Sequence, residues 1–316
     1  MRRRGLLSAL AGGLLATPAG ARTGGPRRVG VLMMNETLFD AALLRKAMAE
    51  RGLVEGVAFI VDFRSADGDT NRLDALAREL VAAKVDAIVA WQTPPAVAAR
   101  RATSGVPIVM SAGDPVGNGL VASLARPGGN VTGIDASTAE LGGKRLELLR
   151  ELLPAARRIG VMTNPPDPFA VPFVRQIEAA APRIGLAVEV VGVDDAGALD
   201  GLVRSMVERR IDAAIVQPSL PVKRIAELAL AHRLPAMSDN RVFAHSGGLL
   251  AYGSNLAERY RLVATYLDRI FKGANPADLP VMRPTQFDLL VNLRTAKALG
   301  IEVPSAFLQR ADEVIE

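Results

Sequence analysis

Residue types that perform acid–base or nucleophilic chemistry are sparse in this sequence. Cysteine is absent, and the only histidines are His232 and His245. His232 ends a predicted helix over residues 226–233, where a cation suits the helix dipole, and His245 precedes a Gly-Gly turn without a partner motif. No motif places a nucleophile beside its base, binds zinc or cradles a phosphate. We therefore predict that the protein is not an enzyme and has no cofactor and no metal site.

Polar side chains instead follow the ends of predicted strands in both halves of the chain. Ligands of open parallel sheets bind beyond the carboxyl ends of the strands, where loops and helix N-termini converge. Two polar rims that face one cleft are therefore expected. The candidate ligand-binding residues are Asn35, Trp91, Gln92, Thr93, Ser111 and Asp114 in the first half and Asn164, Gln217, Ser219, Ser238 and Asp239 in the second.

Several of these residues have a second interpretation. Thr93 precedes a proline and suits a helix N-cap with proline at the first helical position, and Ser219 suits the start of another helix. Asp114, also before a proline, could form a turn. Trp91, the only tryptophan, could belong to the core or stack on a planar ligand.

The elements that would position these residues alternate along the chain. Residues 29–33, 59–63, 87–91 and 106–110 are short apolar runs, typical of parallel strands buried on both faces. Residues 38–51 and 73–83 have leucine and alanine at helical spacing. The pattern predicts repeated βαβ units.

The second half of the chain repeats the first. Residues 27–32 (RRVGVL) recur at 157–162 (RRIGVM), 85–89 (VDAIV) at 211–215 (IDAAI), and 106–111 (VPIVMS) at 234–238 (LPAMS). Three matches in one order predict two similar α/β lobes, each a doubly wound parallel sheet.

Breaks in this pattern predict three segments that cross between the lobes. Lobe 1 is expected over residues 27–134 plus 252–283, and lobe 2 over 135–251 plus 284–316. Asp135, just past the first crossing, could cap the hinge or pair with a ligand ammonium group. Tyr252, at the second crossing, is a candidate ligand contact with the same ambiguity.

Composition excludes some classes of partner. The formal net charge is +5, but without Arg2, Arg3 and Arg4 only 35 basic residues face 33 acidic ones. That balance gives no electrostatic footprint for nucleic acid.

The first 21 residues predict a cleaved secretory signal peptide. Three arginines precede an apolar stretch over residues 5–16 and a small-residue site ending at Ala21. The apolar stretch is shorter than a bilayer span, and the run from Arg3 also suits a twin-arginine signal. Without a cysteine for a lipid anchor, we expect no membrane anchor and a location in the periplasm of a Gram-negative cell.

Long motifs resemble the TrpX-like family of ABC transporter substrate-binding proteins. They are GDPVG at residues 113–117, GLV at 119–121, SLARPGGNVTG at 123–133, GKRLELL at 143–149, PTQF at 284–287 with Asn292-Leu293, TAKALG at 295–300 and RADEVI at 310–315. The resemblance implies a type I periplasmic binding fold with three crossing segments that delivers a solute to a membrane permease and its ATPase. It also implies an aromatic amino acid as ligand, with Thr93 and Ser111 near its carboxylate, although WQTP at residues 91–94 stands where relatives usually have a Gly-Thr-Pro sequence.

We therefore expect a monomeric solute-binding protein that closes its lobes over an amino acid or another small carboxylate or aromatic molecule. Ligand held between two rims stabilises the closed form by its differential affinity. The alternative is a periplasmic sensor that partners a membrane receptor or histidine kinase. A repressor of the same fold is disfavoured, because no helix-turn-helix precedes Arg27 and the chain has an export signal.

Overall fold

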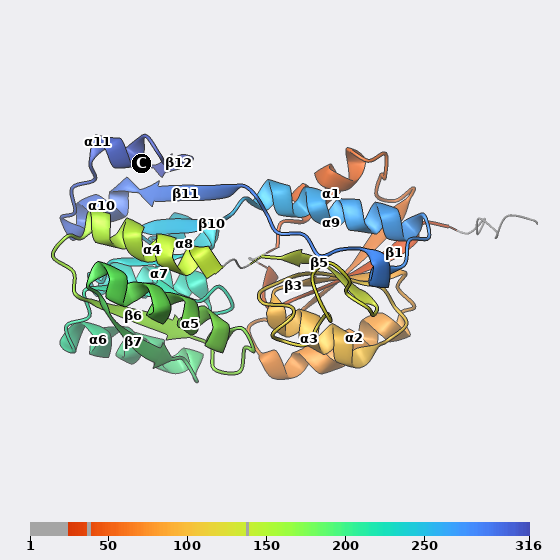
Figure 1. Cartoon of the computed structure of the whole chain (residues 1–316), viewed down its shortest axis with the longest axis horizontal. Helices are drawn as coiled ribbons and strands as arrows, with labels where there is room; N and C mark the ends of the chain where they lie inside the picture. Colours follow the sequence, from red (N-terminus) through yellow and green to blue (C-terminus); the bar gives the residue numbers. More distant parts are fainter. Residues whose placement is uncertain (1–24, 37–38, 137–138) are drawn as a thin grey trace, which may run out of the picture.

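The computed structural model describes residues 25–36, 39–136 and 139–316. The predicted signal peptide, residues 1–21, lies outside the described residues. Within these ranges the chain forms two α/β lobes that lie side by side along the longest axis of the molecule (Figure 1).

Lobe 1 has a five-stranded, wholly parallel sheet in the order β2-β1-β3-β4-β5. The strands are β1 (Arg27–Met33), β2 (Phe59–Ser65), β3 (Ala87–Trp91), β4 (Ile108–Ala112) and β5 (Val131–Asp135). Strands β3, β4 and β5 are buried along their whole length, because helices cover both faces of the sheet.

Helices cover the two faces of this sheet in pairs. α1 (Ala41–Ala49) and α9 (Leu256–Phe271) pack on one face, and α2 (Leu73–Ala82) and α3 (Thr93–Ala102) on the other. Strand alternation divides the core, since Val89 joins the α1/α9 side while Ile88 and Ala90 join the α2/α3 side. Short 3₁₀ turns, η2 (Thr70–Arg72) and η5 (Pro276–Asp278), precede α2 and follow α9.

Lobe 2 has a seven-stranded sheet in the order β12-β11-β10-β9-β8-β6-β7. The strands are β6 (Arg158–Thr163), β7 (Ala187–Gly192), β8 (Ala213–Val216), β9 (Ala236–Ser238), β10 (Leu250–Ser254), β11 (Phe287–Asn292) and β12 (Glu313–Ile315). The sheet is parallel except that β11 runs antiparallel to β10. The reason is topological: β10 leaves lobe 2 towards lobe 1, and β11 returns from it.

The helices of lobe 2 form two further layers. α4 (Ala139–Leu152), α5 (Ala170–Ala180), α10 (Leu293–Leu299) and α11 (Ser305–Leu308) contribute to one core. α6 (Leu199–Glu208), α7 (Val222–Ala231) and α8 (Arg241–His245) contribute to the other. The 3₁₀ turns η3 (Ala181–Ile184) and η4 (Ala196–Ala198) adjoin α5 and α6.

The sequence repeat corresponds to equivalent strands. The order β2-β1-β3-β4-β5 in lobe 1 matches β7-β6-β8-β9-β10 in lobe 2. The repeated aspartates make equivalent hydrogen bonds to the first strand of each lobe. Asp86 accepts the Arg28 N–H at 2.8 Å, and Asp212 accepts the Arg158 N–H at 2.8 Å. The prediction of two similar lobes is confirmed.

Three segments connect the lobes, between β5 and α4, between β10 and α9, and between η5 and β11 (Figure 1). The second and third are braced together. The Asn255 N–H donates to the Gln286 carbonyl at 2.8 Å, and the Asn255 amide donates to the Asp288 carboxylate at 2.8 and 3.0 Å. Among the described residues, no helix has the length and apolarity to cross a bilayer.

Candidate functional site

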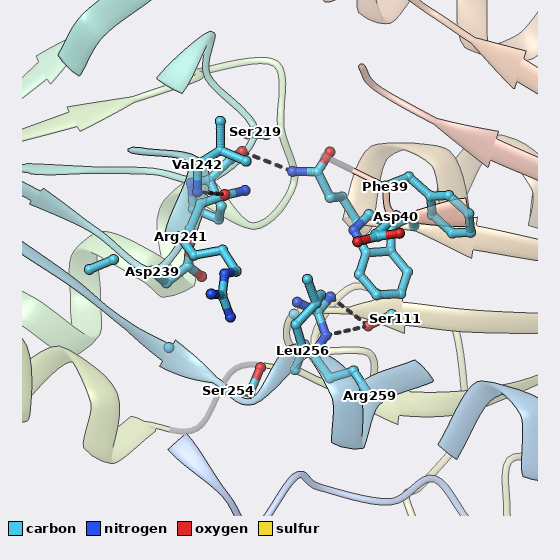
Figure 2. A pocket seen from close by; sticks show the side chains of 18 of the residues that line it. Phe39, Asp40, Ser111, Ser219, Asp239, Arg241, Val242, Ser254, Leu256 and Arg259 are labelled. Carbon is cyan, nitrogen blue, oxygen red and sulfur yellow. Dashed lines mark hydrogen bonds between the residues drawn. The ribbon is translucent and has the colours of Figure 1, made fainter. Parts of the chain in front are cut away.

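A cavity of about 510 Å³ lies between the lobes, where strands from both sheets end. This volume falls within the usual range of small-molecule sites. Figure 2 shows Ser111 and Arg259 of lobe 1 on one side and Asp239 and Ser219 of lobe 2 on the other. The chain thus brings strand-end loops of both lobes to one site, as the strand-end rule predicts.

The lobe 1 wall is built at the ends of β3 and β4. Ser111 is buried in β4, and the hydroxyl of Thr93 accepts the Gly113 N–H at 3.0 Å. Thr93 was expected to cap α3, but it is the first residue of this helix and Gln92 occupies the N-cap position. The Thr93 hydroxyl therefore bonds the neighbouring strand-end loop instead of capping the helix. Gln92 is the only residue between the end of β3 and the start of α3.

Arg259, in the first turn and a half of α9, is the central cation of the cavity. Its Nε and Nη2 donate to Ser111 Oγ at 3.1 and 2.7 Å (Figure 2). Its guanidinium carbon lies 4.2 Å from the centroid of the Trp91 ring. Burial lowers the pKa of Arg259, and Asp239 opposes that shift. No carboxylate of the described residues lies within 4.0 Å of this guanidinium. The cavity therefore contains a cation with spare hydrogen-bond donors.

Trp91 contributes to the cavity lining but is almost wholly buried. Only 2% of its surface is exposed, its ring stacks on Tyr260 at a centroid distance of 4.8 Å, and Phe39 meets it edge-on at 5.3 Å. Of the two interpretations, the core role is the one that the contacts support. The cluster of Trp91, Tyr260 and Phe39 supports the guanidinium of Arg259, which lies over the Trp91 ring.

Asp239 of lobe 2 is the anion on the opposite side of the cavity. It lies just after β9, with one carboxylate oxygen 3.6 Å from a guanidinium nitrogen of Arg145. Arg145, on α4, is buried and donates to the Tyr252 carbonyl at 3.2 Å. Burial raises the pKa of Asp239, while Arg145 and Arg259 act to lower it.

A second carboxylate on the lobe 2 wall is already engaged. Asp167 accepts hydrogen bonds from the Phe169 N–H at 2.9 Å and from Gln217 Nε2 at 2.8 Å. Burial raises the pKa of Asp167. Gln217 in turn accepts the Asn164 N–H at 2.8 Å, so these polar residues support the wall together.

Of the thirteen predicted site residues, all of which the structure describes, six line the cavity. They are Trp91, Gln92, Thr93, Ser111, Ser219 and Asp239. Ser219 was also expected to begin a helix, but α7 starts at Val222, because residues 217–220 form a turn closed by the Leu220 N–H on the Gln217 carbonyl at 3.2 Å.

The other seven predicted residues lie outside the cavity lining. Asn35 faces a smaller neighbouring hollow with residues 220–224 of lobe 2. Asp114 closes a turn by accepting the Gly117 N–H at 3.0 Å, and Asp135 pairs with Arg283 at 3.1 Å.

Four more of these residues have structural contacts. Ser238 donates to the Val216 carbonyl at 2.9 Å, and the Tyr252 ring packs near Phe287. Asn164 and Gln217 belong to the network that supports Asp167. The strand-end rule located the cleft, but which strand-end side chain faces it depends on its local hydrogen bonds.

Sequence reasoning missed Arg259, Phe39, Asp40 and Arg241, all of which line the cavity. Arg259 lies on α9, outside the three sequence segments that repeat and not at a strand end, so the strand-end rule did not reach it. One signal was available: a cation near a helix N-terminus opposes the helix dipole and needs a local reason. Arg241 pairs with Glu313, which also lies 3.0 Å from His245.

The lobes are in direct contact beside the cavity. Gln92 Nε2 of lobe 1 donates to the Pro218 carbonyl of lobe 2 at 2.9 Å. A Cβ added to Gly113 of lobe 1 would lie 2.6 Å from the Phe169 ring of lobe 2. The cleft is thus closed around the cavity. In the described part of the chain, no group of three or more His, Asp or Glu side chains could hold a metal ion.

Two α/β lobes around an interlobe cavity are typical of proteins that bind a small molecule between their lobes. The family model for ABC transporter substrate binding proteins matches residues 40–315, and the chain belongs to this family. A tyrosine-binding protein of Clostridioides difficile is 29% identical over 268 residues, which cover 83% of this chain and 76% of the relative.

Two solved structures bear on the arrangement of the lobes. An ABC domain from Streptococcus pneumoniae in complex with L-Trp is 26% identical, with a TM-score of 0.83 over 92% of this chain and 100% of that one. The ligand-free, open structure of a substrate binding protein with adhesive properties from Clostridium difficile is 27% identical, with a TM-score of 0.64 over 92% and 99%. At nearly the same identity, the whole-chain TM-score is higher for the L-Trp complex than for the ligand-free, open structure.

Proposed function

We propose that this protein captures a free amino acid in the interlobe cavity and delivers it to an ABC permease. The observation that carries the proposal is the pair of opposite charges across the cavity: Arg259 of lobe 1, without a carboxylate within 4.0 Å among the described residues, and Asp239 of lobe 2. The carboxylate of a zwitterion could pair with Arg259 while its ammonium group pairs with Asp239.

The carboxylate end of the ligand would bind in lobe 1. Ser111 Oγ accepts two N–H groups of Arg259, so its own O–H remains available to donate. The guanidinium keeps further N–H donors of its planar fork, which suits a carboxylate.

The ammonium end would bind Asp239 in lobe 2. Each lobe then holds one charge of the ligand, so both interactions form together only when the lobes are closed. A ligand of this kind binds the closed form more tightly than the open form, and closure follows from that difference.

The remaining lining suits an apolar side chain. Phe39, Leu256, Val242, Ala251 and Leu290 provide apolar surface around the charged pair. The printed names of the tyrosine-binding relative and of the L-Trp complex support an aromatic amino acid as the first candidate. Family membership and the predicted export signal support delivery to a permease from the periplasm.

Calorimetry and thermal unfolding with the free amino acids, extended to L-tryptophan methyl ester, N-acetyl-L-tryptophan and tryptamine, would test this proposal. We expect an amino acid to bind and to raise the melting temperature by mass action. Removing either charge of the ligand should weaken binding about 100-fold, because the charged side chain that pairs with it in the closed cleft is left unpaired. Equal binding of the ester and the acid would contradict the zwitterion mode.

Loss of uptake of the labelled amino acid in a deletion strain would test delivery. Restoration by the wild-type chain but not by a binding-deficient variant is the expected result.

A further inference from the structure

Gln92 has a backbone conformation that side chains rarely adopt. Its φ is 80° and its ψ is 168°, at the N-cap of α3. This region of backbone space is occupied almost only by glycine, because Cβ is crowded there. A side chain at such a position needs a compensating contact.

The Gln92 side chain supplies that contact across the cleft. Its Nε2 donates to the Pro218 carbonyl of lobe 2 at 2.9 Å, and both residues line the cavity. The backbone of Gln92 is held separately within lobe 1, where its N–H donates to the Ser111 carbonyl at 2.9 Å. The backbone strain therefore belongs to lobe 1, and the hydrogen bond to Pro218 belongs to the closed arrangement.

The oxygen of the Gln92 amide opposes closure of an empty cleft. Gln92 Oε1 is buried and has no hydrogen-bond partner among the described residues. Closing the lobes thus forms one hydrogen bond but removes water from one acceptor, and an unpaired buried acceptor is costly. The interlobe bond alone is therefore too weak to close an empty cleft, but its modest net contribution adds to the interactions of a bound solute.

We propose that Gln92 is a positioning residue for solute capture, whose amide holds the two lobes together around the bound solute and slows its release. This inference rests on the proposed capture of a solute between the lobes. The strained backbone and the interlobe hydrogen bond both belong to Gln92. Substitutions of this one residue can therefore separate the effect of the strain from the effect of the bond.

Three substitutions separate these effects. Gln92→Glu keeps the size of the side chain but places a carboxylate oxygen against the Pro218 carbonyl. Gln92→Ala removes the amide and keeps the strained backbone. Gln92→Gly removes the amide and relieves the strain, so it should raise the melting temperature of the ligand-free protein by about 2 °C.

The experiment uses the absence of cysteine in the chain. Cysteines introduced at Val57 of lobe 1 and Val207 of lobe 2, whose side chains are 76% and 41% exposed, would carry a dye pair that reports the interlobe distance. L-tryptophan is the probe, and stopped-flow displacement gives its dissociation rate. We expect Gln92→Glu to release the probe about tenfold faster with an unchanged melting temperature, and Gln92→Ala and Gln92→Gly to release it several-fold faster.

Wild-type release rates in Gln92→Glu, together with an unchanged distribution of interlobe distances, would overturn the inference. Should the wild-type protein bind no amino acid, the proposed function fails, and the ligand-free dye traces still decide the role of Gln92. In those traces we expect shorter closed dwell times for Gln92→Glu than for the wild type, and equal dwell times would refute the inference.

Discussion

In the proposed function, the guanidinium of Arg259 is the main binding group of lobe 1. It lies over Trp91, bonds Ser111 and faces the cavity. Arg259→Met should keep the aliphatic packing and remove the charge, which leaves the ligand carboxylate unpaired. We expect a cost of about 2 kcal/mol or more, roughly a 30-fold loss of affinity by calorimetry.

Arg259→Lys is the matched control for this prediction. Lysine keeps the charge but lacks the planar fork, so it should recover only part of the affinity. Fluorescence of Trp91, the only tryptophan in the sequence, gives a second readout with L-tyrosine as ligand. Equal affinity of Arg259→Met and the wild type would remove Arg259 from the site.

In the proposed function, Asp239 should make the capture of an amino acid dependent on pH. Burial raises the pKa of its carboxyl above the ordinary aspartate value, against the lowering effect of Arg145 and Arg259. Only the ionised form pairs with an ammonium group, so affinity should fall on acidification, starting at a higher pH than for an ordinary aspartate. Calorimetry from about pH 8 to about pH 4 measures the profile.

Substitution of Arg145 tests the cause of this profile. Arg145→Met removes the nearer opposing charge and should move the fall in affinity to higher pH, whereas Arg145→Lys should keep it close to that of the wild type. Asp239→Asn should bind weakly with a flat profile. A pH-dependent Asp239→Asn variant would show that another group titrates.

At the scale of elements, the strands were predictable and their loops were only partly so. Continuous apolar runs predicted β3 at residues 87–91, because a strand covered on both faces needs no polar alternation. Thr93 is the first residue of α3 rather than its N-cap, and Ser219 does not begin a helix, because the exact start of a helix depends on the turn geometry before it and not on residue type alone. Arg259 was missed because its helix comes to the cavity from the far end of the chain.

The strand-end loop after β4 and the loop after β6 must fit closely for the cleft to close. A Cβ at Gly113 would lie 2.6 Å from Phe169 Cδ2, and the ring is buried beside Phe173 and cannot easily withdraw. Gly113→Ala should therefore disfavour closure by about 1–3 kcal/mol while lobe 1 stays folded. Small-angle scattering with saturating ligand should show incomplete compaction.

A compensating substitution identifies the contact responsible. Phe169→Ala removes the ring that the new methyl group meets, so the double variant should close more readily than Gly113→Ala alone. Full compaction of Gly113→Ala would mean that the loops rearrange at low cost, and the predicted steric control would be wrong.

At the scale of the whole molecule, the sequence repeat predicted two similar lobes. The two lobes have the same order of five strands and equivalent hydrogen bonds from Asp86 and Asp212 to their first strands. The antiparallel β11 has no counterpart in the first half, and nothing in its own sequence gives its direction. Its direction follows from the path of the chain through the hinge. A sequence repeat therefore does not predict the contacts within the hinge.

Glu258 joins α9 of lobe 1 to the third crossing segment. Its carboxylate accepts the Thr285 N–H at 3.1 Å, the Thr285 hydroxyl at 2.8 Å and the Gln286 N–H at 2.9 Å. Burial acts to raise the pKa of Glu258, but these hydrogen bonds outweigh it and the pKa is lowered. The ionised carboxylate therefore stabilises the hinge at neutral pH.

Glu258→Gln should lower the melting temperature at neutral pH by about 2 °C, corresponding to about 1 kcal/mol after allowance for solvent screening of an exposed group. Because the folded pKa lies below the unfolded one, this stabilisation is complete above the unfolded pKa and is lost as pH falls through the folded pKa. Calorimetric melting temperatures of the two proteins should accordingly converge in acid. A constant difference at all pH values would assign the effect to packing rather than to the charge, and the hinge would then owe its geometry mainly to the Asn255 contacts.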